Sequence, residues 1–372
     1  MYRRLVLPLA AAALGGTLVA CEAAQSSPAP GSTVTPGVAP ASSATAAPPA
    51  PDSVVHAAGS ATPTAATARP DRVPNELGRI PVFEYHLIGD TTTTWSRERG
   101  RFRQDLELMY ERGYRPVTMA EVLDKKIDLP AGISPVVIVF DDASPSQFRY
   151  VERDGALEVD PRSGLGVWLD FKKGRADWPN KAVFCLLPGA EAGRSFFGNK
   201  GIEGQKTEWR FRKLQYLNEL GFELCNHTLW HATLSKYSDA VVQEQIARGD
   251  MAIDSAVPGY RVRTFALPLG VWPKNRALAA SGSWTDPKTK RVVRYQYDAV
   301  LEVAGGPTRS PYDPQFNPRS ILRIPVIGDA VRKELDQLER AGTAYVSDGD
   351  PQTVARKAPA ATAATAAGAS RR

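Results

Sequence analysis

The chain has 372 residues, of which 43% are hydrophobic and 23% are charged, with three cysteines and a formal net charge of +6. This apolar share is enough for a hydrophobic core, which excludes disorder throughout the chain, and three cysteines exclude a small disulfide-built scaffold. Eight basic and five acidic residues fall outside residues 73–347, which leaves +3 for the remainder. No dense basic stripe with interleaved aromatic residues is present, so nucleic acid is not an expected partner.

The first 20 residues are typical of an export signal. Arg3 and Arg4 precede an apolar stretch over residues 5–18 that is too short to span a bilayer comfortably and ends in Leu-Val-Ala-Cys21. This order resembles the lipobox of bacterial lipoproteins, in which the cysteine becomes the lipid-modified N-terminus. We therefore expect an exported protein, anchored through Cys21 to the cell membrane or outer membrane and facing the periplasm or exterior. An ordinary secretory signal with an incidental cysteine is the alternative.

Residues 21–72 and 348–372 consist mostly of small residues and proline, and the first stretch contains no aromatic residue. Such sequences cannot bury enough apolar area to offset the entropy lost on ordering. We therefore predict a disordered Ala/Pro/Ser/Thr-rich linker over 21–72 and a disordered tail over 348–372. A single folded domain is predicted over 73–347.

Apolar strands alternate with amphipathic helices through this domain. The strands are predicted over residues 80–86, 135–140, 181–187, 222–226, 263–267, 292–303 and 321–327, and the longer helices over 97–110, 165–173, 208–220 and 239–256. A capping box at Thr118 and Glu121 opens a short helix, and a β-hairpin surrounds Gly155. This alternation predicts a parallel sheet closed into a β/α barrel, whose active site forms beyond the C-terminal ends of the strands.

Two polar motifs follow predicted strands. His227 and His231 are four residues apart, a common spacing for a metal pair, and Thr228 stands where a zincin-type protease needs a glutamate. Asp141 and Asp142 end a fully apolar strand, where two carboxylates are costly unless they are paired or metal-bound. Taken alone, the histidines fit satisfied or surface side chains on a loop better than a metal site, and the carboxylates fit a polar strand end as well as a functional site.

The order of the motifs resembles the polysaccharide deacetylase domain (NodB-like, carbohydrate esterase family 4) over most of residues 80–327. The motifs are Tyr85-His86, Phe140-Asp141-Asp142, Asn226-His227-Thr228-x-x-His231 and Phe265-Ala-Leu-Pro268-Leu-Gly270. The resemblance implies an α/β fold, a distorted (β/α)7 barrel with a single catalytic domain. It also implies one divalent metal ion, most often Zn²⁺, and the removal of acetyl groups from N-acetylated sugars.

The same resemblance implies roles for individual residues. Asp142, His227 and His231 correspond to the metal ligands, and Asp141 corresponds to the general base. The backbone N–H of Leu269 corresponds to the donor that helps hold the oxyanion.

Two features of the family pattern are missing. Ala266 stands where the family usually has the arginine that steers the base, and Leu322-Arg323-Ile324 stands where it usually has Leu-x-His with the general acid. The sequence also resembles the circularly permuted poly-N-acetylglucosamine deacetylases, which carry the acid histidine in a Tyr-His motif on the first strand. His86 is therefore the predicted general acid.

The predicted function is a metal-dependent hydrolase that removes N-acetyl groups from the amino sugars of an envelope or extracellular polysaccharide and releases acetate. Two alternatives stay open. One is a non-catalytic, lipid-anchored glycan-binding homologue, which the missing arginine and terminal histidine favour. The other is an O-acetyl esterase that acts on xylan-like glycans with the same centre.

Aromatic residues and cysteines near these motifs carry further expectations. Trp230 and Trp272 are candidates for stacking on sugar rings, although large aromatic residues such as these and Trp284 more often belong to the core. Cys185 and Cys225 fall on neighbouring predicted strands of an exported protein. We expect two buried thiols there, because adjacent parallel strands seldom offer disulfide geometry.

Overall fold

The computed structural model describes residues 68–189 and 195–356. The predicted export signal, Cys21, most of the predicted linker and the tail from residue 357 lie outside the described residues. Among the described helices, none combines the length and apolar character needed to cross a bilayer.

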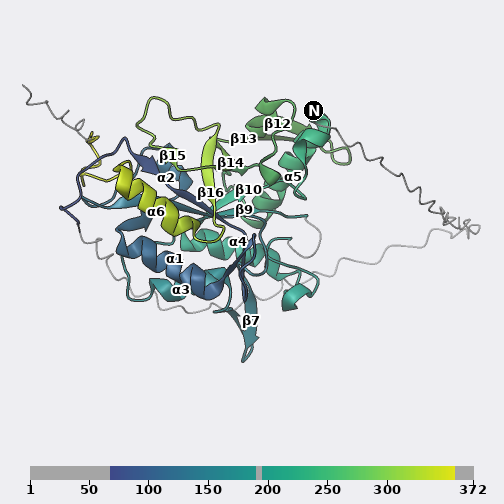
Figure 1. Ribbon diagram of the computed structural model, residues 1–372. Helices are drawn as coiled ribbons and strands as arrows, with labels where there is room; N and C mark the ends of the chain where they lie inside the picture. Colours follow the sequence, from purple (N-terminus) through teal and green to yellow (C-terminus); the bar gives the residue numbers. More distant parts are fainter. Residues whose placement is uncertain (1–67, 190–194, 357–372) are drawn as a thin grey trace, which may run out of the picture. The chain divides into compact units, whose positions relative to one another are not determined.

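A closed barrel of parallel strands forms the centre of the described structure (Figure 1). Each barrel strand pairs in parallel with its neighbours, and the last strand pairs back with the first. The predicted (β/α)7 barrel is therefore confirmed. In order around the barrel, the strands are β2 (Val82–Tyr85), β16 (Ile321–Pro325), β14 (Ala299–Gly305), β11 (Thr264–Ala266), β10 (Glu223–Asn226), β9 (Val183–Leu186) and β6 (Ser134–Phe140).

The barrel is distorted at two places. The first half of β6 pairs with the short strand β5 (Tyr114–Pro116), and β9 pairs with β6 only at Val139 and Phe140. In addition, an antiparallel hairpin of β12 (Ser281–Thr285) and β13 (Val292–Gln296) is inserted in the chain between β11 and β14, which pair directly with each other. The strand predicted over 292–303 is therefore two strands, of which only the second belongs to the barrel.

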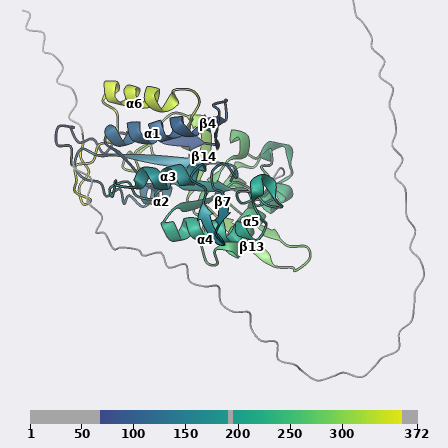
Figure 2. The same ribbon diagram turned by 90° about the horizontal axis from the view of Figure 1, so that it is seen from below.

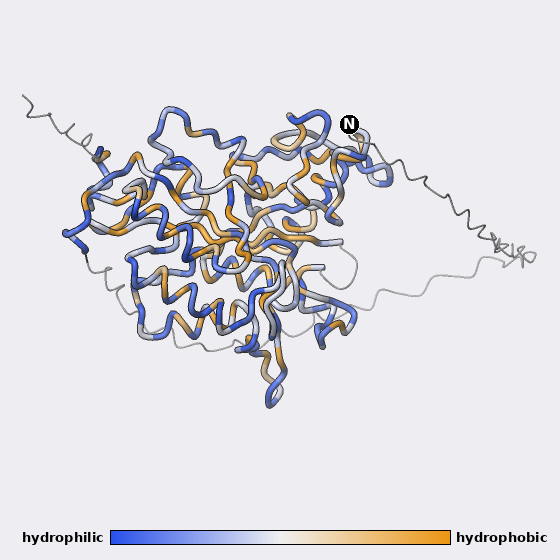
Figure 3. Tube along the Cα trace, viewed as in Figure 1, coloured by the Kyte–Doolittle hydropathy of each residue, from blue (hydrophilic) through white to orange (hydrophobic). Residues whose placement is uncertain are grey.

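Residues of the barrel strands alternate between two hydrophobic clusters. In β6, Val137 and Val139 belong to the cluster inside the barrel, whereas Ile138 and Phe140 belong to the cluster between barrel and helices. Side chains of a strand alternate between its faces, so a strand buried on both faces is apolar throughout. Figure 3 shows this apolar centre, with hydrophilic residues on the surrounding loops. The same alternation directs the next residue, Asp141, towards the barrel interior.

Helices cover the outside of the barrel. Helix α1 contacts both α3 and α6, and the three lie next to one another in Figure 1, while Figure 2 gives the view from below. The predicted capping box of α2 is present, with both reciprocal Thr118–Glu121 hydrogen bonds. Gly221 ends α4 with a φ of 92°, which a residue without a Cβ adopts easily. The helices are α1 (Arg99–Glu111), α2 (Met119–Leu123), α3 (Gly164–Lys172), α4 (Trp209–Leu220), α5 (Asp239–Ala256) and α6 (Ala330–Ala341).

Short elements and the chain ends complete the described structure. The predicted hairpin is present as β7 (Tyr150–Arg153) and β8 (Ala156–Val159). The remaining strands are β1 (Arg79–Ile80), which pairs with β15 (Thr308–Arg309), and β3 (Leu87–Gly89), which pairs with β4 (Ser96–Glu98). The Ala355 N–H donates to Glu76 Oε2 at 3.0 Å, so the packed part of the chain extends beyond residue 347.

Candidate functional site

The predicted site residues come together at the C-terminal ends of three barrel strands. His86 directly follows β2, Asp141 and Asp142 follow β6, and His227 follows β10, with His231 four residues further on. In a parallel barrel all these strand ends open on the same side. Residues that are up to 145 positions apart in the sequence therefore share one polar centre.

Asp142, His227 and His231 form a compact group that fits a metal ion. Asp142 Oδ1 lies 3.5 Å from Nε2 of His227 and 3.5 Å from Nε2 of His231. The two imidazole rings are 4.9 Å apart between centroids. Two imidazole nitrogens and one carboxylate leave a position open on a tetrahedral ion, the arrangement that catalytic zinc sites use.

His227 is held in the tautomer that a metal ligand needs. Its Nδ1 lies 2.9 Å from the Ala266 carbonyl oxygen and donates to it, so Nε2 carries the lone pair. Among the described residues, this buried Nε2 has no hydrogen-bond partner. Burial by itself would lower the pKa of His227, but Asp141 and Asp142 outweigh it and raise the pKa. The two carboxylates thus favour a positive charge at this point, which suits a metal cation.

The backbone of the site segments is strained. Asp142, Ala143, Thr228, His231 and Leu269 all have φ values between 48° and 79°. Non-glycine residues pay about 1 kcal/mol or more in this region, and a β-branched residue such as Thr228 is rarely found there. Strain of this kind persists only where the surrounding structure fixes it, and here it accompanies two predicted metal ligands and the predicted oxyanion donor.

A network behind the histidine segment supplies part of that support. The side-chain amide of Asn226 contacts Asp250 Oδ1 and the Tyr297 hydroxyl, both at 2.7 Å, and its Oδ1 accepts the Thr228 N–H at 2.7 Å. A Cβ at Gly249 would lie 2.3 Å from Asn226 Oδ1. Glycine inside a helix is unfavourable, so Gly249 in α5 indicates that another group packs closely against the helix there. The close contact between Gly249 and Asn226 was not predicted from the sequence.

Asp141 lies inside the barrel beside a buried cation. Nη1 of Arg323 donates to both carboxylate oxygens of Asp141 at 2.9 Å, and Asp141 Oδ2 is 3.8 Å from His227 Nε2. Burial by itself would raise the pKa of Asp141, but Arg323, His227 and His86 outweigh it and hold the pKa below its ordinary value. Asp141 is therefore an ionised carboxylate that can accept a proton.

Arg323 contacts Asp141 in a chain that has Ala266 where the family usually has an arginine. Its side chain is fully buried, and it reaches Asp141 from β16 rather than from the strand that carries Ala266. Ala266 contributes only its carbonyl oxygen, which holds His227. The arginine is thus missing at its usual position, as the sequence indicated, but a buried guanidinium reaches Asp141 from another strand. The sequence did contain an indication of this pair. Arg323 is a single arginine within the apolar strand β16, and a buried charge needs a partner of opposite charge.

Glu84 also belongs to the centre and was not predicted. Its Oε1 lies 3.3 Å from His86 Nε2, and its Oε2 lies 3.3 Å from Arg323 Nε. Burial raises the pKa of Glu84 to about 8, with Asp141 adding to the effect and Arg323 opposing it. Burial also lowers the pKa of His86. Glu84 is on β2, two residues before His86, so both side chains face the interior of the barrel. A carboxylate within an apolar strand could have indicated Glu84 from the sequence.

Leu269 lies in a one-turn 3₁₀ helix, η3 (Pro268–Gly270), with a φ of 57° and an exposed side chain. A Cβ at Gly270 would come within 2.8 Å of Val303, so the turn packs closely on β14. The turn follows β11, next to the strand that carries His227. It therefore stands at the same end of the barrel as the predicted metal ligands.

The predicted sugar-stacking tryptophans have different surroundings. Trp230 is 43% exposed and lies in the chain segment between His227 and His231. Trp272 is partly buried against the core, hydrogen-bonded to Glu302 at 3.1 Å and covered by the Arg276 guanidinium at 3.7 Å from its ring. Trp230 is thus the more accessible of the two.

The expectation of two buried thiols is wrong. Cys185 on β9 and Cys225 on β10 are direct register partners, with Cα atoms 4.2 Å apart, and they form a disulfide. Both belong to the cluster inside the barrel. Disulfides between adjacent parallel strands are rare in general. These two side chains meet directly because the residues are register partners and both point into the barrel. Cys225 is two residues before His227, so the bond lies close to one of the predicted metal ligands.

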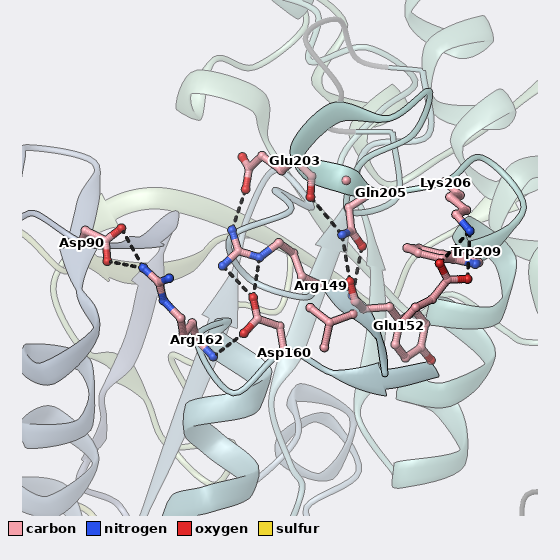
Figure 4. Close-up of a pocket in the computed structure, with 12 residues that line it drawn as sticks. Asp90, Arg149, Glu152, Asp160, Arg162, Glu203, Gln205, Lys206 and Trp209 are labelled. Atoms are coloured by element: carbon pink, nitrogen blue, oxygen red, sulfur yellow. Dashed lines mark hydrogen bonds and ion pairs between the residues drawn. The ribbon is translucent and has the colours of Figure 1, made fainter. Parts of the chain in front are cut away.

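A separate cavity of about 630 Å³ lies beside the hairpin of β7 and β8 (Figure 4). Its charged residues pair with one another: Arg149 contacts Asp160 at 2.9 Å and Glu203 at 2.7 Å, and Lys206 contacts Glu152 at 2.8 Å. None of the predicted site residues lines it. Its charges are satisfied by internal pairs, so it does not compete with the strand-end centre as a candidate catalytic site.

The protein is a β/α barrel that carries, at the C-terminal ends of its strands, residues of the types that can bind a metal ion. Residues 181–282 match the family model described as polysaccharide deacetylase. Over this segment the chain is similar to the polysaccharide deacetylases. The matched segment contains His227, His231 and Leu269, whereas His86, Asp141 and Asp142 precede it.

Individual relatives were found by sequence and by structure. A chitooligosaccharide deacetylase from Sinorhizobium fredii is 29% identical over 142 residues, which cover 36% of this chain and 64% of the relative, just under two thirds of its length. The Streptococcus pyogenes deacetylase PplD, in complex with acetate, has a TM-score of 0.49 at 18% identity and covers 71% of this chain and 98% of its own. IcaB from Ammonifex degensii has a TM-score of 0.48 at 18% identity, and the match covers 70% of this chain and 96% of IcaB.

Proposed function

We propose that the protein is a metal-dependent hydrolase that removes N-acetyl groups from amino-sugar residues of a polysaccharide and releases acetate. The observation that carries the proposal is the ionised Asp141, held by Arg323 and placed 3.8 Å from His227 at the edge of the metal-ligand group. A chitooligosaccharide deacetylase among the relatives supports the choice of an acetylated glycan as substrate. Asp142, His227 and His231 would hold one divalent ion, and their ligand chemistry favours Zn²⁺.

The residues of the chain then have distinct tasks. A bound divalent ion would supply Lewis-acid chemistry to an acetyl carbonyl and to water. Asp141 accepts the proton of the attacking water, and Arg323 keeps Asp141 ionised for this step. The Leu269 N–H donates to the oxyanion of the tetrahedral adduct. His86 delivers a proton to the departing amine nitrogen. Its Nε2 lies 3.3 Å from Oε1 of Glu84, close enough for the two groups to share a proton.

The presence of Arg323 weighs against the binding-only alternative. That alternative drew support from a missing steering arginine, but the buried guanidinium of Arg323 reaches Asp141 from another strand. The Tyr85-His86 position on the first barrel strand supports the likeness to the permuted poly-N-acetylglucosamine branch. The O-acetyl esterase alternative uses the same centre and differs only in the bond that is cleaved.

The test uses the full chain, metal analysis by mass spectrometry, and acetate release from N-acetylglucosamine oligomers and from acetylated xylan. Asp141→Asn should abolish release while bound metal stays at the wild-type level, and Asp142→Ala should lose the metal. Asp170→Asn, on the exposed surface of α3, is the matched control and should keep both. Wild-type release by Asp141→Asn would exclude the base role. Metal binding without release from either glycan would favour the binding protein, and release from xylan alone would favour the esterase.

We also propose that the protein is exported and lipid-anchored at Cys21, facing the periplasm or exterior. The proposal is supported by the basic pair, the apolar stretch and the Leu-Val-Ala-Cys sequence. Mass spectrometry of the mature N-terminus should find a diacylglyceryl group on Cys21, and Cys21→Ala should release the protein from the membrane fraction. An unmodified Cys21 within an uncleaved or differently cleaved N-terminus would contradict it.

A further inference from the structure

Trp95 is an exposed aromatic residue that touches the predicted general acid. Its side chain is 49% exposed, and its ring centroid lies 4.8 Å from that of His86, with the rings tilted by 57°. It lies in the loop between β3 and β4. An indole half open to water beside a polar centre leaves apolar surface available to a ligand.

The loop that carries Trp95 is fixed by hydrogen bonds. The Trp95 carbonyl oxygen accepts the Leu87 N–H at 2.9 Å, which ties the loop to the strand that follows His86. The next residue, Ser96, donates its N–H to Thr93 Oγ1 at 3.1 Å and its hydroxyl to the Thr91 carbonyl at 3.0 Å. The indole is therefore presented in a defined place, which reduces the ordering entropy that stacking on a ligand would cost.

The position of His86 tells which part of the substrate meets Trp95. His86 groups with Glu84 and Asp141, whereas the predicted metal ligands lie on the His227 side of Asp141. Under the proposed function the acetyl carbonyl binds on the metal side, and the nitrogen that His86 protonates belongs to the sugar. The sugar ring must then lie over His86, next to the free surface of Trp95.

We propose that Trp95 is a sugar-binding residue that stacks on a pyranose ring and selects chains of gluco-configured amino sugars. The proposal rests on the proposed function. A β-linked glucopyranose has equatorial substituents, so its axial C–H bonds form an apolar face that suits an indole. An axial hydroxyl at C4, as in galacto-configured sugars, interrupts that face. Trp95 therefore sets the substrate class through the ring and not through the acetyl group.

Binding is measured first, so that it does not depend on turnover. In the Asp141→Asn background, calorimetry compares tetramers of N-acetylglucosamine and N-acetylgalactosamine. Adding Trp95→Ala should weaken binding of the glucosamine tetramer about tenfold and remove most of the preference over the galactosamine tetramer. Trp95→Phe should restore part of the affinity. Phe211→Ala, which removes an exposed aromatic ring on α4, is the matched control and should bind as the parent does.

Kinetics in the otherwise wild-type chain then separate binding from an effect on His86. Trp95→Ala should raise KM for the tetramer more than it lowers kcat. The pH profile of kcat should stay as in the wild-type chain. Unchanged binding by Trp95→Ala, or a loss confined to kcat with a displaced pH profile, would overturn the proposal, since Trp95 would then only position His86. If the wild-type chain binds the tetramer without releasing acetate and Trp95→Ala weakens that binding, the sugar-binding role of Trp95 is supported and the proposed hydrolase function is excluded.

Discussion

The buried guanidinium of Arg323 joins two carboxylates, and its removal has calculable consequences. Arg323→Met keeps an unbranched apolar stem but removes the guanidinium and its charge, and leaves Asp141 and Glu84 buried without their cation. Breaking a fully buried ion pair by removing one partner costs about 3–5 kcal/mol. We therefore expect the free energy of unfolding at pH 7 to fall by about that amount.

The same change acts on proton transfer. Opposite unit charges about 4 Å apart attract by about 4 kcal/mol at an effective dielectric constant of about 20, which corresponds to about three pH units in a pKa. Loss of Arg323 should therefore raise the pKa of Asp141 by up to about this amount. The acid limb of the pH profile of kcat/KM moves upward, and the activity deficit shrinks as pH rises.

The stability effect has a defined pH dependence. In the wild-type chain the depressed pKa of Asp141 contributes stability that is present above about pH 4 and is lost as pH falls through the folded-state pKa. In the variant the folded-state pKa is raised instead. Its stability deficit should therefore grow as pH rises from about 4 to the new pKa.

Urea unfolding at several pH values and kcat/KM on a glucosamine oligomer measure these effects. Arg309→Met is the matched control, because the Arg309–Asp313 pair is partly exposed and is worth about 1 kcal/mol or less. Glu84, whose raised pKa leaves it mostly protonated at pH 7, adds little to the cost of removing Arg323, so adding Glu84→Gln to Arg323→Met should change the stability little. If Arg323→Met unfolds like Arg309→Met and keeps the wild-type pH profile, the electrostatic reasoning is refuted. If it does not fold, Arg323→Lys, which keeps a charge, must fold and show a smaller profile shift.

Three more predictions concern the surroundings of the site. Replacing Cys185 and Cys225 by alanine should lower the free energy of unfolding by about 4 kcal/mol, since the bond spans 40 residues, and an unchanged urea midpoint would mean that the thiols are not bonded in solution. Tyr297→Phe removes the hydroxyl at 2.7 Å from Asn226 and should weaken metal binding about tenfold in a chelator competition; wild-type affinity would show that the hydroxyl does not support the histidine segment. In the metal-free protein the pKa of Glu84 is raised to about 8, so wild-type stability should fall as pH rises from about 4.5 to 8. Glu84→Gln should flatten this curve, and an equal slope in both proteins would contradict the shift.

Local patterns were enough for much of the fold. The period of apolar residues in α5 and the capping box of α2 are properties of a few neighbouring residues, and both were predicted where they occur. The strand β6 was recognised from its continuous apolar run, since a strand buried on both faces has no polar side. The two strands within 292–303 were not separated, because both are rich in apolar residues and only pairing distinguishes them.

The motif residues were predicted for a similar reason. Asp141, Asp142, His227 and His231 stand out because polar groups at the ends of apolar strands need a partner, and the order of the motifs resembles a known family. Glu84 was overlooked, although it lies two residues before His86. A single polar residue in a strand has no spacing pattern to mark it.

The sequence by itself determined the barrel class and the residues that gather at the strand ends. It also predicted which side chains could ligate a metal, from the residue types and from the order of the motifs. Only the tertiary structure decided that Arg323 reaches Asp141 from another strand, and that Cys185 meets Cys225. The physical reason is that barrel closure and strand register bring together residues that no local pattern relates, and charge pairing and covalent bonding depend on distances of a few ångströms.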